Sequence, residues 1–149
     1  LLLRTRDAAL YEAALRRATG QAFARVLARA GTAGMIRPVP GTDPGYLRFP
    51  IRLPGGLSGL EAGARRGGAD AASLRRLGIF ASYPQTLAEL PAVARRYRGR
   101  ARAWPGAAEL ARTLVTLPTH SLLSATERRA ILQCVVARAG APPLEEMLR

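Results

Sequence analysis

The sequence predicts an α+β fold, in which a long N-terminal helix precedes a small domain with a short, mainly antiparallel sheet and packed helices. Three observations support this prediction. Residues 5–30 are rich in Ala, Leu and Arg and contain no Pro, which favours a helix. Residues 46–53 alternate polar and apolar side chains, as a half-buried strand does. Ser124 and Glu127 have the spacing of a capping box, which opens a helix that extends to about residue 139.

The first helix is expected to present one apolar stripe to the rest of the protein. Asp7 suits the N-terminal end of this helix, and Gly20 allows a kink in its middle. Residues 37–45 are rich in Pro and Gly and predict a linker. The stripe consists of Tyr11, Leu15, Ala18, Ala22 and Val26, widened by Phe23 and Leu27.

Strands, helices and loops are expected in turn along residues 46–117. Pro50 lacks an N–H group, so the strand over residues 46–53 is expected at a sheet edge or a bulge. Residues 54–68 are Gly-rich but match no phosphate-binding pattern, which predicts a flexible surface loop. After this loop we expect a helix over residues 71–77, a strand over 79–82, a loop over 83–91, helices over 92–97 and 107–114, and a strand over 115–117.

The charge of the chain allows two interpretations. All 23 basic residues are Arg, against 10 acidic residues, so the net charge is +13. We favour the interpretation that Arg stands throughout where other proteins use Lys, because the arginines are spread along the whole chain and no nucleic-acid-binding signature is present. On this interpretation we expect no nucleic-acid partner. An Arg-rich module for nucleic acid or another polyanion is the alternative. Its binding residues would be the densest cluster, interleaved with Tyr97 and Trp104, which comprises Arg95, Arg96, Arg98, Arg100 and Arg102.

Several kinds of chemistry are excluded by composition. Without Lys the chain cannot form a lysine imine. The single Cys134 excludes an internal disulfide and fits a reducing, cytoplasmic location. The single His120 excludes a multi-histidine metal centre, and we expect no metal site. No apolar run approaches the roughly 20 residues of a membrane span, so no membrane partner is expected. Because the chain starts with Leu1 and not Met, we expect it to be the end of a longer polypeptide.

Three segments in order resemble a known domain. They are residues 83–91 (YPQTLAELP), 105–111 (PGAAELA) and 117–124 (LPTHSLLS). With the strand at residues 46–51 and the turn at residues 77–79, they resemble the C-terminal small domain of the DegT/StrS-type sugar aminotransferase family, over about residues 44–140. Two positions depart from the family pattern, since Thr86 and Ala88 stand where many members have Pro and His.

The resemblance implies a pyridoxal-phosphate enzyme that moves an amino group from an amino acid to a keto-sugar nucleotide. Its cofactor would be bound by a lysine of a large domain, so this chain would hold no catalytic residue and no cofactor, and pyridoxal phosphate would belong to the full-length parent. Residues 1–36 would be the connecting helix from the missing large domain, 37–45 a linker, 46–140 the small domain and 141–149 a tail. The domain would cover the cofactor cleft and support a homodimer of the parent. A catalytically inactive relative that acts as an assembly or regulatory subunit is also open.

Three residues are candidates for contact with a nucleotide-sugar substrate. Arg48 shares the polar face of its strand with Arg52, where it could hold a carboxylate or a diphosphate. Tyr83 opens the Tyr-Pro segment of the resemblance. His120 follows the Leu-Pro turn, where it could touch substrate or a partner subunit. The competing interpretations are a solvated strand face for Arg48 and a turn hydrogen bond for His120. Cys134 is expected to be a buried structural thiol.

Overall fold

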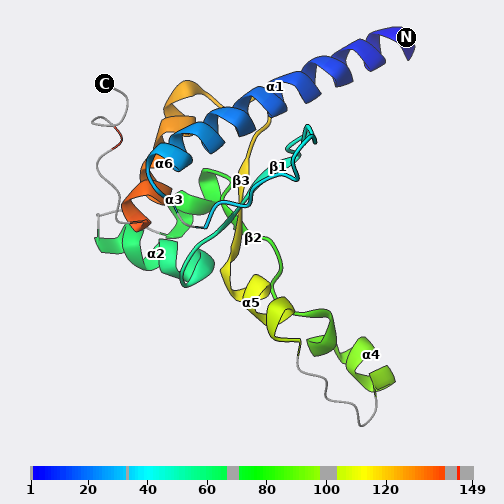
Figure 1. Ribbon diagram of the computed structural model, residues 1–149, viewed down its shortest axis with the longest axis vertical. Helices are drawn as coiled ribbons and strands as arrows, with labels where there is room; N and C mark the ends of the chain where they lie inside the picture. Colours follow the sequence, from blue (N-terminus) through cyan, green and yellow to red (C-terminus); the bar gives the residue numbers. More distant parts are fainter. Residues whose placement is uncertain (1, 33, 67–70, 98–103, 140–143, 145–149) are drawn as a thin grey trace.

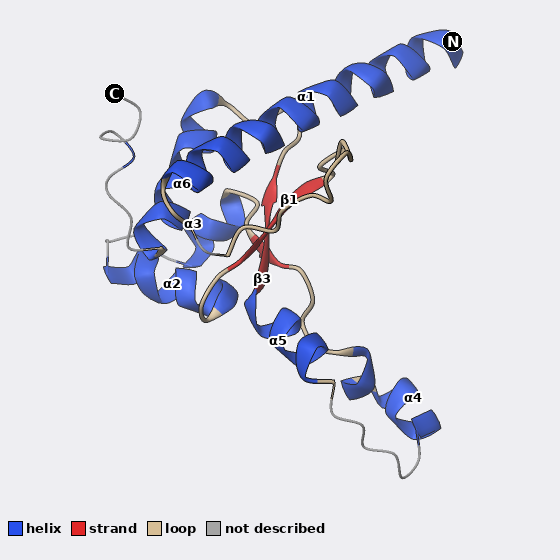
Figure 2. Ribbon diagram, in the orientation of Figure 1, coloured by secondary structure: helices blue, strands red, loops and turns tan. Residues whose placement is uncertain are grey.

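The element order is helix, strand, two helices, strand, helices, strand, helix. In the computed structural model, residues 2–32, 34–66, 71–97, 104–139 and 144 are described. The α+β class expected from the sequence is confirmed (Figures 1 and 2). The elements are α1 (Leu2–Arg29), β1 (Arg48–Arg52), α2 (Gly56–Arg66), α3 (Ala71–Arg76), β2 (Phe80–Ala81), α4 (Pro91–Ala94), α5 (Pro105–Thr113), β3 (Leu114–Pro118) and α6 (Ala125–Arg138), with 3-10 turns at Leu87–Glu89 and Arg95–Tyr97.

The three strands form one antiparallel sheet in the order β1-β3-β2. In the pairing of β1 with β3, Phe49 lies opposite Leu117 and Ile51 lies opposite Val115. β1 is an edge strand, so the expectation drawn from Pro50 is confirmed, although the strand is shorter than residues 46–53.

The core lies on one face of this sheet. Phe49 and Val115 are almost fully buried there. Helix α1 packs against β1 and α2 packs against β3, and α6 packs against both helices (Figure 1). Phe23 of α1 meets Phe49 edge-to-face, with ring centroids 5.9 Å apart. Such aliphatic and aromatic burial is the main force that holds α1 against the sheet. The other buried side chains that share this core include Leu27, Leu53, Leu60, Leu74, Ile79, Leu117, Ile131 and Val135.

The prediction of a loop over residues 54–68 is wrong, because α2 occupies most of this segment. Gly59 and Gly63 are four residues apart in α2, so they lie on one face of the helix, and the Arg138 side chain of α6 lies beside this face. Gly55 precedes the helix and has a positive φ of 74°. A Cβ atom on Gly59 would lie 2.6 Å from the Pro54 carbonyl oxygen and 3.2 Å from Nε of Arg138. Gly59 therefore allows α2 to lie close to the Pro54 carbonyl and the Arg138 side chain, and the Gly-rich composition of this segment does not mark a flexible loop.

Helix α1 runs without a break past Gly20, where a kink was possible. A Cβ atom at Gly20 would lie 2.4 Å from Cγ of Tyr46, so this glycine makes room for the tyrosine ring. Asp7 is not in the first turn, because the helix begins at Leu2. The expected stripe is correct only from Ala22 onward, since Tyr11 is 68% exposed and Ala18 is exposed as well. The first half of α1 extends beyond the rest of the fold (Figure 1).

The last long helix begins as expected. Ser124 Oγ accepts a hydrogen bond from the Glu127 N–H at 3.1 Å, and a Glu127 carboxylate oxygen accepts one from the Ser124 N–H at 2.8 Å. This capping box fixes the start of α6 and, with it, the turn that follows β3. Among the helices that the structure describes, none is both long and apolar enough to cross a membrane.

Candidate functional site

Arg48 lies on the sheet face opposite the core, and its guanidinium is bound by the fold itself. Nε donates to Thr116 Oγ1 at 2.8 Å, and one Nη donates to the Thr116 carbonyl at 3.1 Å and to the Gly78 carbonyl. The guanidinium also lies over the Phe80 ring, 5.3 Å from its centroid. Burial lowers the pKa of Arg48. The side chain thus joins all three strands, and much of its hydrogen-bonding capacity is used within the protein.

Tyr83 lines a cavity of about 540 Å³. The cavity lies between the N-terminal turn of α2, the segment after β2, and α5. Tyr83 itself is 57% exposed. Hydroxyl, amide and guanidinium groups line it beside the tyrosine, contributed by Ser58, Gln85, Thr86 and Arg112. Ala88, which stands where many family members have His, is not among the lining residues.

His120 lies at the other end of β3. Its ring is half-buried, and Nδ1 has no hydrogen-bond partner within the described ranges of the chain. The neighbouring Ser121 N–H donates to Glu12 of α1 at 3.3 Å, so the turn at His120 is attached to the long helix. Arg16 adds to this attachment by pairing with Glu12 at 2.7 Å and donating to the Leu47 carbonyl at 3.0 Å.

The structure does not bring the three candidates into one site. Ser82, next to Tyr83, donates to the Leu114 carbonyl at 3.0 Å, whereas His120 follows Pro118. β3 spans about 13 Å between Leu114 and Pro118 at the usual rise per residue. Tyr83 and His120 therefore lie at opposite ends of β3.

The basic cluster is described only in part. Arg95 and Arg96 are exposed in the 3-10 turn after α4, and Nε of Arg95 donates to the Pro91 carbonyl at 3.1 Å. Arg98, Arg100 and Arg102 lie outside the described residues. The α4–α5 arm around this turn projects away from the sheet (Figure 2). It carries apolar side chains that are exposed by more than a third, namely Leu87, Leu90, Trp104 and Leu110.

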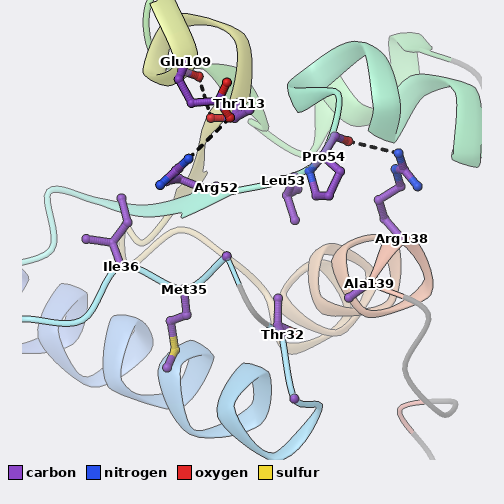
Figure 3. Close-up of a pocket in the computed structure, with 12 residues that line it drawn as sticks. Thr32, Met35, Ile36, Arg52, Leu53, Pro54, Glu109, Thr113, Arg138 and Ala139 are labelled. Carbon is purple, nitrogen blue, oxygen red and sulfur yellow. Dashed lines mark hydrogen bonds and ion pairs between the residues drawn. The ribbon is translucent and has the colours of Figure 1, made fainter. Parts of the chain in front are cut away.

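A second cavity, of about 660 Å³, lies where the C-terminal ends of α1, β1, α5 and α6 meet (Figure 3). The side chains that line it with polar groups are Thr32, Arg52, Glu109, Thr113 and Arg138, and the remaining walls are apolar side chains and glycines. This cavity was missed in the sequence because its residues come from four elements and share no local motif. The sequence pattern indicated only single residues of this cavity, such as Arg52 on the polar face of its strand.

Metal and thiol chemistry find little support in the described residues. Within these ranges no group of three or more His, Cys, Asp and Glu side chains could hold a metal ion. Cys134 is a free, half-buried cysteine, and burial raises the pKa of its thiol, so it is a poor nucleophile.

Comparison with known proteins identifies the fold. No protein-family model matches the chain, and no curated protein matches its sequence significantly. One solved structure that matches is DesV from S. venezuelae, determined by X-ray crystallography in complex with a ketimine intermediate. The TM-score is 0.66 at 24% sequence identity, and the match covers 95% of this chain but 36% of DesV. DesV is a pyridoxal-phosphate-dependent sugar aminotransferase of the DegT/DnrJ/EryC1/StrS family. The resemblance expected from the sequence is thus confirmed at the level of the fold, which is that of about one third of such an enzyme.

Proposed function

We propose that this chain is the C-terminal small domain of a sugar-nucleotide aminotransferase-like protein, and that it is not catalytic alone. The observation that carries the proposal is the unequal coverage of the structural match, 95% of this chain against 36% of DesV. Nearly all of the chain therefore corresponds to one part of a larger enzyme. Its role would be to cover the cofactor cleft of a large domain and to support a homodimer.

Pyridoxal phosphate does not fit the residues of this chain. The cofactor acts through an imine, which needs a lysine amine, and the sequence contains no Lys. We therefore assign no catalytic step to this chain. The lysine would have to come from the large domain of the parent protein.

Exposed apolar side chains supply surfaces for such a large domain. Leu10 and Tyr11 are 61% and 68% exposed on the projecting half of α1. An isolated helical segment of this length is only marginally stable in water, so packing against another domain would stabilise it. The exposed leucines and Trp104 of the α4–α5 arm offer a second apolar surface.

Of the three candidate substrate residues, Tyr83 has the strongest support. It lines a cavity together with Ser58, Gln85 and Arg112, which offer the hydrogen-bond donors that a nucleotide sugar requires. The guanidinium of Arg48 is already bound to Thr116, so we propose a structural role for it and not a substrate contact.

The lack of catalysis alone is tested by mixing the purified chain with pyridoxal phosphate and an amino donor, with DesV as the positive control. We expect the visible absorbance of a protein imine in DesV and not in this chain, and borohydride should attach cofactor covalently to DesV alone. A stoichiometric borohydride adduct on this chain, or specific transamination by it, would overturn this part of the proposal.

Polyanion binding remains the alternative function, and the exposure of Arg95 and Arg96 is the observation that favours it. It predicts an affinity for DNA or RNA that falls steeply as salt concentration rises, because counterions are released on binding. Replacing both arginines by Gln should then weaken binding and reduce the salt dependence. Binding that is absent at low salt would exclude this alternative.

A further inference from the structure

We propose that the cavity in Figure 3 binds a small aliphatic carboxylate. Its volume of about 660 Å³ lies within the range of small-molecule sites. It shares no lining residue with the cavity at Tyr83, so the proposal does not depend on the proposed function.

The first observation is a buried hydroxyl without a partner. Thr32 follows the C-terminal end of α1, is 8% exposed and lines the cavity. Its Oγ1 is buried and makes no hydrogen bond within the described residues. Buried hydroxyls nearly always have a partner, so the exception needs an explanation. A ligand oxygen in the cavity would accept the hydrogen bond that this hydroxyl can donate.

The second observation is an excess of positive charge around the cavity. Three helices end here, and each carries an arginine in its last turn that offsets the partial negative charge of its C-terminus: Arg29 in α1, Arg112 in α5 and Arg138 in α6. Arg52 adds a further positive charge, and Glu109 is the acidic residue of the lining.

The two lining guanidiniums have capacity for a ligand. Nη2 of Arg52 contacts Glu109 at 3.4 Å, which is a long hydrogen bond. Nη2 of Arg138 donates to the Pro54 carbonyl at 3.0 Å, whereas Nε of Arg138 is buried against Gly59 of α2 and has no partner in the described chain. A carboxylate matches the planar donor geometry of a guanidinium. The combination of guanidinium and hydroxyl donors therefore fits a carboxylate.

The remaining wall is apolar and sets the character of the ligand body. Met35 and Ile36 lie on one side of the cavity, with Leu53 and Pro54 opposite and Ala139 beside Arg138 (Figure 3). An aliphatic chain would bury its surface against these side chains. Aromatic rings are absent from the lining, so there is no stacking partner for a nucleobase.

The site can be tested with isocaproate, a branched six-carbon carboxylate, and with isocaproamide as its uncharged analogue. The chain has two methionines, Met35 and Met147, so carbon-13 labelling of their ε-methyl groups gives two signals, which M147L would assign. We expect saturable movement of the Met35 signal with isocaproate and at least about tenfold weaker binding of isocaproamide, since hydrogen bonds to charged groups are the stronger ones. Equal affinity for both compounds, or an unmoved Met35 signal, would refute the site.

Four variants complete the test. T32V should weaken binding about fivefold while leaving stability unchanged or raised, because its hydroxyl has no partner to lose. T32S keeps the hydroxyl and should bind as the unchanged protein does. R138M keeps the aliphatic stem beside α2 and should weaken binding about tenfold. R128M is the matched control, since Arg128 is exposed near the start of the same helix. Equal losses of isocaproate affinity in R138M and R128M would indicate general charge attraction and overturn the proposal. If T32V fails to fold, the affinities of R138M and T32S still test the site.

Discussion

Arg48 offers the sharpest test of how this fold is held together. Replacing it by Met keeps most of the aliphatic stem but removes the donors to Thr116 Oγ1, the Thr116 carbonyl and the Gly78 carbonyl. It also removes the cation from the Phe80 ring. A hydrogen bond contributes about 1 kcal/mol net, and more when the donor is charged. A cation over an aromatic ring at a partly exposed site adds about 0.5–1 kcal/mol.

The net loss in R48M is smaller than the sum of these contributions, because the variant avoids the free-energy cost of burying the charged guanidinium. Three hydrogen bonds and one ring contact, less that relief, suggest a loss of about 2–3 kcal/mol in the free energy of unfolding. R48K should recover less than half of the loss, since an ammonium group cannot reproduce the planar fork of donors.

Urea unfolding, followed by circular dichroism, measures this loss. R52M is the matched control, because Arg52 lies two residues along the same strand, its side chain is 47% exposed and it contacts only Glu109 among the described ion pairs, at 3.4 Å. Such exposed pairs contribute at most about 1 kcal/mol, so R52M should cost less than R48M. If R48M lowers the free energy of unfolding by less than about 0.5 kcal/mol, the structural role is refuted and Arg48 is again a candidate for substrate contact.

Two further predictions concern the helices. G59A should lower the free energy of unfolding by about 1–3 kcal/mol, because its Cβ would lie 2.6 Å from a backbone oxygen. G63A should leave this free energy unchanged or raise it by up to about 1 kcal/mol through helix propensity, since the nearest contact of its Cβ would be 3.8 Å away. Equal effects of the two substitutions on urea unfolding would contradict the packing of α2 described above. The Ser124 N–H lowers the pKa of Glu127, so the stabilisation that this carboxylate provides is present above its ordinary pKa and is lost as pH falls through the lowered value. Thermal unfolding between about pH 6 and pH 2 should therefore show a smaller acid-induced loss of stability in E127Q than in the unchanged protein, and identical pH profiles would count against the cap.

Local patterns in the sequence predicted the parts of the fold that local physics controls. The capping box at Ser124 and Glu127 and the edge position of Pro50 depend on neighbouring residues, and both are as expected. The Gly-rich composition of residues 54–68 was interpreted as a flexible surface loop. The four-residue spacing of Gly59 and Gly63 was the available signal for a helix face, but only the structure shows that Gly59 lies against the Pro54 carbonyl and the Arg138 side chain of α6.

The candidate sites depended on contacts that are distant in the sequence. Arg48 and Thr116 are 68 residues apart, so the sequence alone could not show that the guanidinium is bound within the sheet. The cavity at Thr32 requires α1, β1, α5 and α6 to end at one place, which no local motif encodes. Tyr83 was named from the resemblance, and the structure adds the cavity beside it.

The central claim, that this chain serves as one domain of a larger aminotransferase-like protein, is tested most directly by a chimaera. In it, this chain replaces the matched 36% of DesV, and DesV with an unchanged sequence is the control. We predict that the chimaera is soluble, forms a dimer and retains pyridoxal phosphate, as judged by sedimentation and by the visible absorbance of the protein imine. A chimaera that folds, as circular dichroism would show, but stays monomeric and does not retain the cofactor would contradict the claim.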